Sequence, residues 1–356
     1  MQILDNFFNN PPKVNEFYSR KLKLPSNKSF NLYGAIGVGK SALIVNYLSY
    51  FAKYSYLYID MLDPQFILEE FTLRDLEEFI KYEKIECLVI DHYIDGFLEQ
   101  LPKVNQFIVI TQTKCNFVDS HYKLYPLDFE EYFSISKANS ISSSFSQYTK
   151  SGSLPSIAIN GINSFAPREL FFEKLDDQLG RVLLLLSLFQ CKVTTIHQAF
   201  QVAKSNFNIS KDKFYSSSKE LIAKELIYQI DTYDKAIGKK IIFYDFAMAK
   251  YLNKNLNYTN TFDALIAIAL IKHDIEIKAI INPLGYITSN KNLILIAPFE
   301  DEDSIWSRVQ NSFGFYSKLK PKSVTIITNS NSYEFTISNI KFKAIPFYEW
   351  ATTLEA

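Results

Sequence analysis

The stretch that decides the fold is Gly-Ala-Ile-Gly-Val-Gly-Lys-Ser at residues 34–41, which matches the pattern G-x-x-x-x-G-K-[ST]. Only 10 of the 356 residues are glycine, so such a match rarely arises by chance. A strand-like segment at residues 31–33 runs into it, and residues 41–53 follow with apolar side chains at helical spacing. This setting predicts the phosphate-binding loop of a protein that binds a nucleoside triphosphate.

Each residue type in this loop has a physical role in holding phosphates. Glycine lets the backbone curl so that its N–H groups surround the phosphate oxygens. The loop has three glycines: Gly34, Gly37 and Gly39. Lys40 is predicted to reach the β- and γ-phosphates of ATP, and the hydroxyl of Ser41 to coordinate Mg²⁺. Ala42 follows on the predicted helix and completes the predicted cofactor-binding set.

A carboxylate at a strand end is predicted to join Ser41 in the magnesium site. Asp91 ends the apolar run at residues 87–91, and Asp60 ends a similar run at residues 54–60. P-loop proteins hold magnesium through a water molecule with such a carboxylate. We favour Asp91 for metal binding and catalysis, because a strand that directly follows the first helix less usually supplies this carboxylate.

The residue after Asp91 departs from the usual hydrolytic pattern. ATPases of the additional-strand class normally have a glutamate there to polarise the attacking water, whereas this chain has His92. Its imidazole could act as a base, or His92 could start a helix without a catalytic duty, and the sequence leaves both interpretations open. Asp95 follows a few residues later, and the sequence does not show whether its carboxylate could reach the attacking water. Binding of ATP is therefore predicted independently of its hydrolysis.

Polar residues follow the strand-like run at residues 107–111. A side chain at this strand end would lie between the phosphate loop and Asp91, where it can sense the γ-phosphate. We select Thr113 for this catalytic role, and the alternative is a simple strand cap. Arg168 has the chemistry of an arginine finger, but nothing in the sequence places it at a nucleotide.

Residues 29–126 alternate between short β-branched runs and helical patterns, which indicates βαβ units and a buried parallel sheet. The expected strands are residues 29–34, 54–60, 87–91, 107–111 and 121–126. The expected helices between them are residues 41–53 and 64–82. The predicted fold class is α/β, with a P-loop NTPase parallel sheet that has helices on both faces.

Two further domains are expected after the P-loop ATPase domain and its helical extension, which we place at residues 1–178. Residues 179–245 predict three helices and a two-stranded ribbon, the pattern of a winged helix. Its third helix, residues 211–226, has lysines beside acidic residues, which favours a solvated mixed-charge face over a helix that reads DNA. Residues 246–356 alternate helices and strands, which predicts a small α/β domain.

Composition narrows the class of protein. Lys+Arg and Asp+Glu both number 38, so only a local basic patch could attract nucleic acid. The three cysteines lack the spacing of metal ligands, which favours free thiols in a reducing cytosol. The most apolar runs are far shorter than the ~20 residues of a membrane span, and the first residues lack the pattern of a signal peptide. We therefore expect a soluble, cytoplasmic protein without a membrane partner.

The order of segments resembles a large bacterial and archaeal family of AAA-type ATPases that have a winged helix and a C-terminal domain similar to restriction endonucleases. The resemblance covers most of the chain and rests on four segments: residues 32–43, 88–95, 107–114 and 125–133. In the last of them, the run PLDFEEY resembles the stretch PLSFEEF that follows the last sheet strand in this family.

The sequence departs from the family pattern at three places. Asp91-His92 stands where the family usually has Asp-Glu, and Gln112-Thr113 stands where it usually has Gly-Ser. Nuclease-like relatives would have an Asp on one strand and Glu-x-Lys on the next. The corresponding residues 282–287 and 293–299 have no such carboxylate or lysine.

Acidic residues near these strands have another interpretation. Residues 300–303 are expected to be the solvated N-terminus of a helix. Asp263 and Glu276 are expected at the surface. The resemblance therefore implies a nuclease fold without nuclease chemistry.

Together these features predict an ATP-driven molecular switch, in which the nucleotide state repositions the winged helix and the C-terminal domain as surfaces for a protein partner. The alternative is a DNA-binding regulator or DNA-processing accessory ATPase that uses the winged helix directly. A small-molecule kinase is disfavoured, because we find neither a base for the phosphate acceptor nor a lid.

Overall fold

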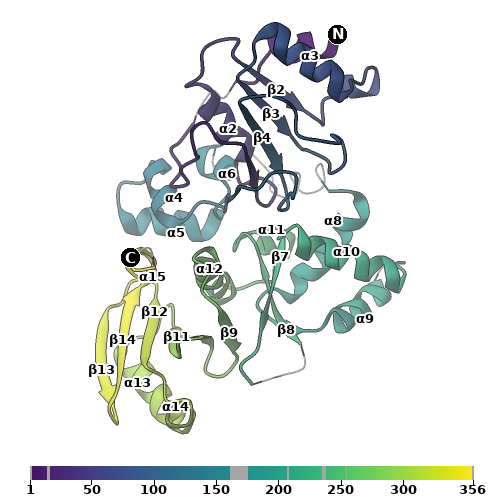
Figure 1. The fold of residues 1–356 in the computed structure, drawn as a ribbon. Helices are drawn as coiled ribbons and strands as arrows, with labels where there is room; N and C mark the ends of the chain where they lie inside the picture. The colour runs from purple at the N-terminus through teal and green to yellow at the C-terminus, as the bar shows by residue number, and fades with distance from the viewer. Residues whose placement is uncertain are drawn as a thin grey trace. The chain divides into compact units, whose positions relative to one another are not determined.

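The structure is a computed structural model, and it describes residues 2–13, 17–160, 175–206, 208–234, 238–253 and 255–354 (Figure 1). The chain divides into two compact units, Met1–Pro126 and Leu127–Ala356. The predicted limits at residues 178 and 245 fall inside the second unit and stay predictions. Arg168 lies outside the described residues. Within the described ranges, every helix is too short or too polar to cross a membrane.

The first unit is built on a five-stranded parallel sheet with the order β2-β3-β4-β1-β5. Its strands are β1 (Phe30–Tyr33), β2 (Tyr56–Asp60), β3 (Cys87–Asp91), β4 (Gln106–Thr111) and β5 (His121–Lys123). The central strands β3 and β4 are buried along their whole length, as parallel strands between helices usually are. The predicted α/β fold class, with a P-loop NTPase sheet, is confirmed.

Helices cover both faces of this sheet (Figure 1). Helices α1 (Gln2–Asn9) and α3 (Leu73–Glu83) share one hydrophobic core with alternate residues of β2, β3 and β4. Helix α2 (Lys40–Leu48) packs on the other face, where the ring of Tyr47 lies edge-on to Phe30 of β1 with 6.3 Å between the ring centroids. The phosphate loop therefore leads from a buried strand into a helix that lies against the sheet.

The helix expected at residues 64–82 is divided, which corrects the prediction. A short 3-10 helix, η1 (Pro64–Ile67), comes first, and α3 begins only after Thr72. The Thr72 hydroxyl accepts a hydrogen bond from the N–H of Asp75, and the Asp75 carboxylate accepts one from the N–H of Thr72. This capping box satisfies free N–H groups at the start of α3 and fixes where that helix begins.

The second unit begins with a helical part and a small antiparallel sheet. Its helices are α4 (Phe129–Ile135), α5 (Ile141–Ser151), α6 (Pro155–Asn160), α8 (Asp177–Leu186), η3 (Ser187–Phe189), α9 (Ile196–Asn206), α10 (Lys211–Ala223) and α11 (Met248–Leu252). Strands β6 (Val193–Thr194), β7 (Ile227–Asp231) and β8 (Lys239–Phe243) pair in the order β6-β8-β7. Helices α8 to α10 and the β7–β8 ribbon match the elements expected at residues 179–245, and their identity as a winged helix stays a prediction.

The rest of the second unit is built on a six-stranded mixed sheet with the order β13-β14-β12-β11-β10-β9. Its strands are β9 (Ile277–Ile280), β10 (Gly285–Thr288), β11 (Asn292–Ile296), β12 (Ser323–Thr328), β13 (Tyr333–Ile337) and β14 (Ile340–Pro346). Its helices are α12 (Tyr258–Lys272), α13 (Glu302–Asn311), α14 (Phe313–Leu319) and α15 (Phe347–Thr352). Helices and strands alternate along this part of the chain.

Asp263 is buried, so the prediction that it lies at the surface is wrong. On α12 it pairs with Lys240 of β8, whose Nζ lies 2.6 Å from Oδ2 of Asp263. The two residues are far apart in the sequence, and a buried carboxylate is stable only with such a partner. Glu276 is exposed, as expected.

Candidate nucleotide-binding site

The predicted phosphate-binding loop connects β1 to α2 at the carboxyl end of the parallel strands. Its glycines have φ angles of 151° at Gly34, 79° at Gly37 and 92° at Gly39, which other residues rarely adopt. At Gly34 there is also no room for a side chain, because a Cβ atom would lie 2.2 Å from the carbonyl oxygen of Leu124. The backbone geometry therefore requires the glycines that the motif contains.

Lys40, Ser41 and Ala42 are the first residues of α2. The start of a helix has N–H groups without a helical partner and a favourable field for anions. The Lys40 ammonium donates to the carbonyl oxygens of Gly34, at 2.7 Å, and Ala35, at 2.9 Å. It is therefore held over the loop by two of the loop's own carbonyl groups.

Asp91 ends β3, and both of its carboxylate oxygens are hydrogen-bonded. Oδ1 accepts from the N–H of His92 at 2.8 Å, and Oδ2 accepts from the hydroxyl of Tyr58 at 2.5 Å. The side chain of Ser41 lies near the Tyr58 hydroxyl. Burial, together with the negative charge of Asp91, raises the pKa of Tyr58 far above its usual value, so the phenol stays neutral. The Tyr58 hydroxyl is thus bonded to Asp91 and lies close to Ser41.

This pair of oxygen donors fits a magnesium ion. Mg²⁺ prefers oxygen ligands and usually binds through one or two protein groups, several waters and the phosphates of its substrate. Ser41 and Asp91 both lie close to the phenol oxygen of Tyr58. Within the described residues, no group of three or more His, Cys, Asp or Glu side chains could hold a metal. Ser41 and Asp91 could therefore hold Mg²⁺ only together with waters and phosphate oxygens.

His92 does not start a helix, which corrects that part of the interpretation. It lies in a turn after β3 with a φ angle of 54°. Its ring Nδ1 is 2.8 Å from Oδ1 of Asp60, and Asp60 ends β2 beside Asp91 in the parallel register. Asp95 is exposed and accepts a hydrogen bond from the thiol of Cys115 at 3.1 Å. His92 thus joins the ends of two neighbouring strands.

The end of β4 lies between β3 and β1, so it separates Asp91 from the phosphate loop in the sheet order. Thr113 is exposed, two residues beyond the end of this strand. Its carbonyl oxygen accepts a hydrogen bond from the Thr111 hydroxyl at 2.6 Å. The Asn31 amide on β1 donates to Oγ1 of Thr111 at 2.7 Å and accepts from the N–H of Cys115 at 3.0 Å. Asn31 therefore fixes the loop that contains Thr113.

Sequence reasoning missed Tyr58 and two further positioning residues of this site, Asn31 and Arg20. Asn31 could have been noticed, because it is a buried amide within an apolar strand. Arg20 had no such signal. Its guanidinium donates to the carbonyl oxygen of Val38 at 2.9 Å and to that of Tyr125 at 2.7 Å. It thereby ties the phosphate loop to the chain that follows β5.

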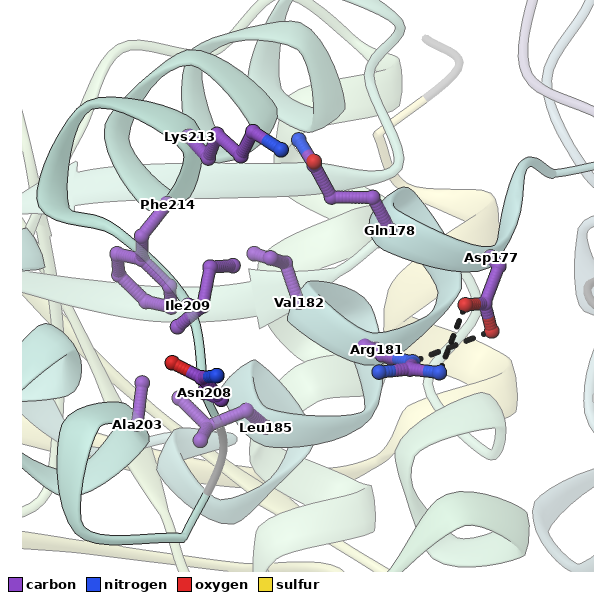
Figure 2. Close-up of a pocket in the computed structure, with 10 residues that line it drawn as sticks. All are labelled: Asp177, Gln178, Arg181, Val182, Leu185, Ala203, Asn208, Ile209, Lys213 and Phe214. Carbon is purple, nitrogen blue, oxygen red and sulfur yellow. Dashed lines mark hydrogen bonds and ion pairs between the residues drawn. The ribbon is translucent and has the colours of Figure 1, made fainter.

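A separate cavity of about 200 Å³ lies between α8, α9 and α10 (Figure 2). Its apolar lining residues are Val182, Leu185, Ala203, Ile209 and Phe214. The polar ones are Asp177, Gln178, Arg181, Asn208 and Lys213, and Asp177 pairs with Arg181 at 2.8 Å. None of the predicted nucleotide-binding residues lines it, and it is smaller than most small-molecule sites. This cavity is therefore distinct from the candidate nucleotide site.

The acidic residues 300–303 form a helix start, as expected. Asp301 caps α13 by accepting a hydrogen bond from the N–H of Ser304 at 2.9 Å. Glu300 pairs with Arg308 at 2.7 Å. Strands β10 and β11, which include most of the stretches compared with nuclease motifs, are antiparallel neighbours.

No protein-family model and no curated protein matches the chain. Among solved structures, a Walker-type ATPase of Pyrococcus abyssi is similar, with 11% identity over 64% of this chain and 91% of that chain and a TM-score of 0.44. Drosophila ORC bound to AT-rich DNA and Cdc6 has 12% identity over 68% of this chain and 86% of that chain, with a TM-score of 0.19. Drosophila ORC bound to DNA has 10% identity over 65% of this chain and 91% of that chain, with a TM-score of 0.25. Similarities this weak identify neither the family nor the function.

Proposed function

We propose that the chain binds ATP with Mg²⁺ through residues 34–42 and Asp91, and that it hydrolyses the nucleotide slowly. The observation that carries this proposal is the geometry around the phosphate loop. The Lys40 ammonium is held over the loop, and the hydroxyl of Tyr58 is bonded to Asp91 and lies near Ser41. In this proposal Lys40 binds the phosphates, and Ser41 and Asp91 hold the metal ion that neutralises their charge.

Asp91 is assigned the metal role in preference to Asp60. Strand β3 is separated from β1 by β4 alone, whereas β2 lies at the edge of the sheet. Asp91 is also buried and bonded to Tyr58, which lies near Ser41, while Asp60 is bonded to the His92 ring. The position of Thr113 beyond β4 supports its proposed role as the residue that senses the γ-phosphate.

We further propose that nucleotide binding acts as a switch for a protein partner. The segments after residue 178 contain two further sheets and none of the predicted catalytic residues. They are therefore the proposed partner-binding surfaces. Affinity purification of tagged wild-type protein and of Lys40→Ala should identify partners whose recovery depends on the nucleotide.

Calorimetry with Mg-ATP tests the nucleotide site itself. Lys40→Ala removes the charge-assisted hydrogen bonds of the ammonium to phosphate, and we expect it to weaken binding by about 2–3 kcal/mol. Lys53→Ala, which removes an exposed lysine beyond α2, is the matched control and should bind as the wild type does. Equal affinities of wild type and Lys40→Ala would overturn the assignment.

The alternative function is DNA binding through α10. Three exposed lysines on this helix favour it: Lys211, Lys213 and Lys219. Lys224, by contrast, is neutralised by Glu220 at 2.6 Å. Contacts from lysine to DNA phosphates would make the affinity fall steeply with added salt. Binding of a labelled DNA duplex at several salt concentrations would therefore distinguish this alternative from a protein-binding module.

A further inference from the structure

Tyr58 points toward the face of the sheet on which α2 lies. Its neighbours on β2, Leu57 and Ile59, belong to the core shared with α1 and α3. Successive side chains of a strand point to opposite faces, so Tyr58 faces α2. Its ring is buried, with 5% of the residue exposed, and its hydroxyl reaches Asp91 of the neighbouring strand and Ser41 at the start of α2.

The hydrogen bonds of this hydroxyl have a defined direction. A phenol has a single proton, and an ionised carboxylate can only accept, so Tyr58 donates to Asp91. Toward the hydroxyl of Ser41, which lies nearby, the phenol oxygen can therefore act only as an acceptor. A Ser41 hydroxyl that donates to Tyr58 keeps its oxygen lone pairs directed elsewhere, where they are available to a metal ion.

The same hydrogen bond restricts the Asp91 carboxylate. Its Oδ1 accepts a hydrogen bond from the N–H of His92. Within the described residues, the only hydrogen bond to its Oδ2 comes from the Tyr58 hydroxyl. Removal of the phenol hydroxyl would leave the carboxylate free to turn about its remaining hydrogen bond. Ser41 would at the same time lose the acceptor that orients its proton.

We propose that Tyr58 is a positioning residue of the magnesium site, which orients the Ser41 hydroxyl and holds Asp91 so that both present oxygen lone pairs to a Mg²⁺ ion that arrives with the nucleotide. This inference rests on the proposed function. Outer-shell hydrogen bonds of this kind orient metal ligands, and their loss typically weakens metal binding by about 10–100-fold. Tyr58 acts only through Ser41 and Asp91, so its loss should affect the metal-dependent part of nucleotide binding.

The experiment measures the affinity for a fluorescent ATP analogue in excess EDTA and in saturating Mg²⁺. Tyr58→Phe keeps the ring and removes only the hydroxyl. We expect its affinity in EDTA to stay within about twofold of wild type, and the gain in affinity on adding Mg²⁺ to fall by about tenfold. Tyr56→Phe is the matched control on the same strand and should retain both values, because none of the described contacts joins its hydroxyl to the site.

Two outcomes would overturn the role of Tyr58. One is a Tyr58→Phe protein with the wild-type magnesium gain, and the other is an equal loss of affinity in EDTA and in Mg²⁺, which indicates a merely structural role. Wild-type protein that binds the analogue in neither condition would instead overturn the proposed function.

A double-mutant cycle provides a second measurement that does not depend on the absolute affinity of either variant. In a Ser41→Ala background, Tyr58→Phe should cause a smaller further loss of the magnesium gain than it causes in the wild type, because the part of its effect that passes through Ser41 is already lost and only the bond to Asp91 remains. Independent, additive losses would contradict the proposal. Thermal unfolding of each variant confirms that the proteins compared are folded.

Discussion

Lys240 and Asp263 form an ion pair in the interior of the second unit, with 3% and 2% of their side chains exposed. Lys240 Nζ lies 2.8 Å from Oδ1 of Asp263 and 2.6 Å from Oδ2. The hydroxyl of Tyr286 also donates to Asp263, and its ring lies 4.6 Å from the ammonium of Lys240. The pair therefore connects β8 to α12 and β10, so the β7–β8 ribbon and the six-stranded sheet are joined by buried charge.

Lys240→Met should destabilise the protein by about 3–5 kcal/mol, because it leaves the carboxylate of Asp263 buried without its counter-charge. Lys239→Met is the neighbouring control. Lys239 pairs with Asp231 at 3.0 Å on the exposed side of β8, and loss of such a pair should cost about 0–1 kcal/mol. Urea unfolding of the two variants measures the difference, and similar midpoints would show that the buried pair has no special role.

Gly34→Ala should weaken ATP binding and lower stability. The φ angle of 151° is unfavourable for alanine, and the new Cβ would lie 2.2 Å from the carbonyl oxygen of Leu124, so the loop must shift. Backbone strain of this kind costs about 1–3 kcal/mol. Gly314→Ala is the control, since Gly314 lies in α14 with open space around it, and alanine there should be neutral or stabilising. Wild-type affinity in Gly34→Ala would contradict the assigned loop geometry.

Turnover of ATP should be slow, well under about 1 s⁻¹. Positioning of the attacking water is a large part of phosphoryl-transfer catalysis, and His92 stands where a glutamate would orient that water. His92→Glu is expected to raise the rate of phosphate release, whereas His92→Gln, which provides no carboxylate, should not. A wild-type rate of tens per second would reveal another base.

The C-terminal part should not cleave DNA. A metal-dependent nuclease needs convergent carboxylates and a group that activates water. Between residues 279 and 299, Lys291 is the only ionisable residue apart from Tyr286, whose hydroxyl is committed to Asp263. Glu300 and Asp301 are engaged by Arg308 and by the start of α13. The measurement incubates full-length protein with supercoiled plasmid and single-stranded DNA, in Mg²⁺ and in Mn²⁺, with and without ATP. Cleavage that survives purification and disappears when residues 300–303 are replaced would contradict this expectation.

The phosphate loop could be predicted from sequence, because its chemistry depends on neighbours in the chain. The roles proposed for Gly34, Lys40 and Ser41 rest on a spacing of a few residues at a strand-to-helix junction. The parallel strands were also predictable, because β-branched and aliphatic runs such as residues 87–91 must be buried on both faces. Local capping shifted only the boundaries, as at Thr72, where α3 begins later than its apolar pattern indicates.

The tertiary structure alone decided which distant side chains meet. Tyr58 lies between Ser41 and Asp91 because β2 pairs with β3 in parallel register and α2 lies on the face to which Tyr58 points. Arg20 reaches the phosphate loop, and Asp263 becomes a buried partner of Lys240, by the same kind of long-range packing. A sequence pattern specifies the period and polarity of each helix and strand. The order of the strands and the direction in which each helix faces arise from the burial of many apolar surfaces at once. The long-range contacts of Tyr58, Arg20 and Asp263 depend on that arrangement, so the sequence pattern alone does not predict them.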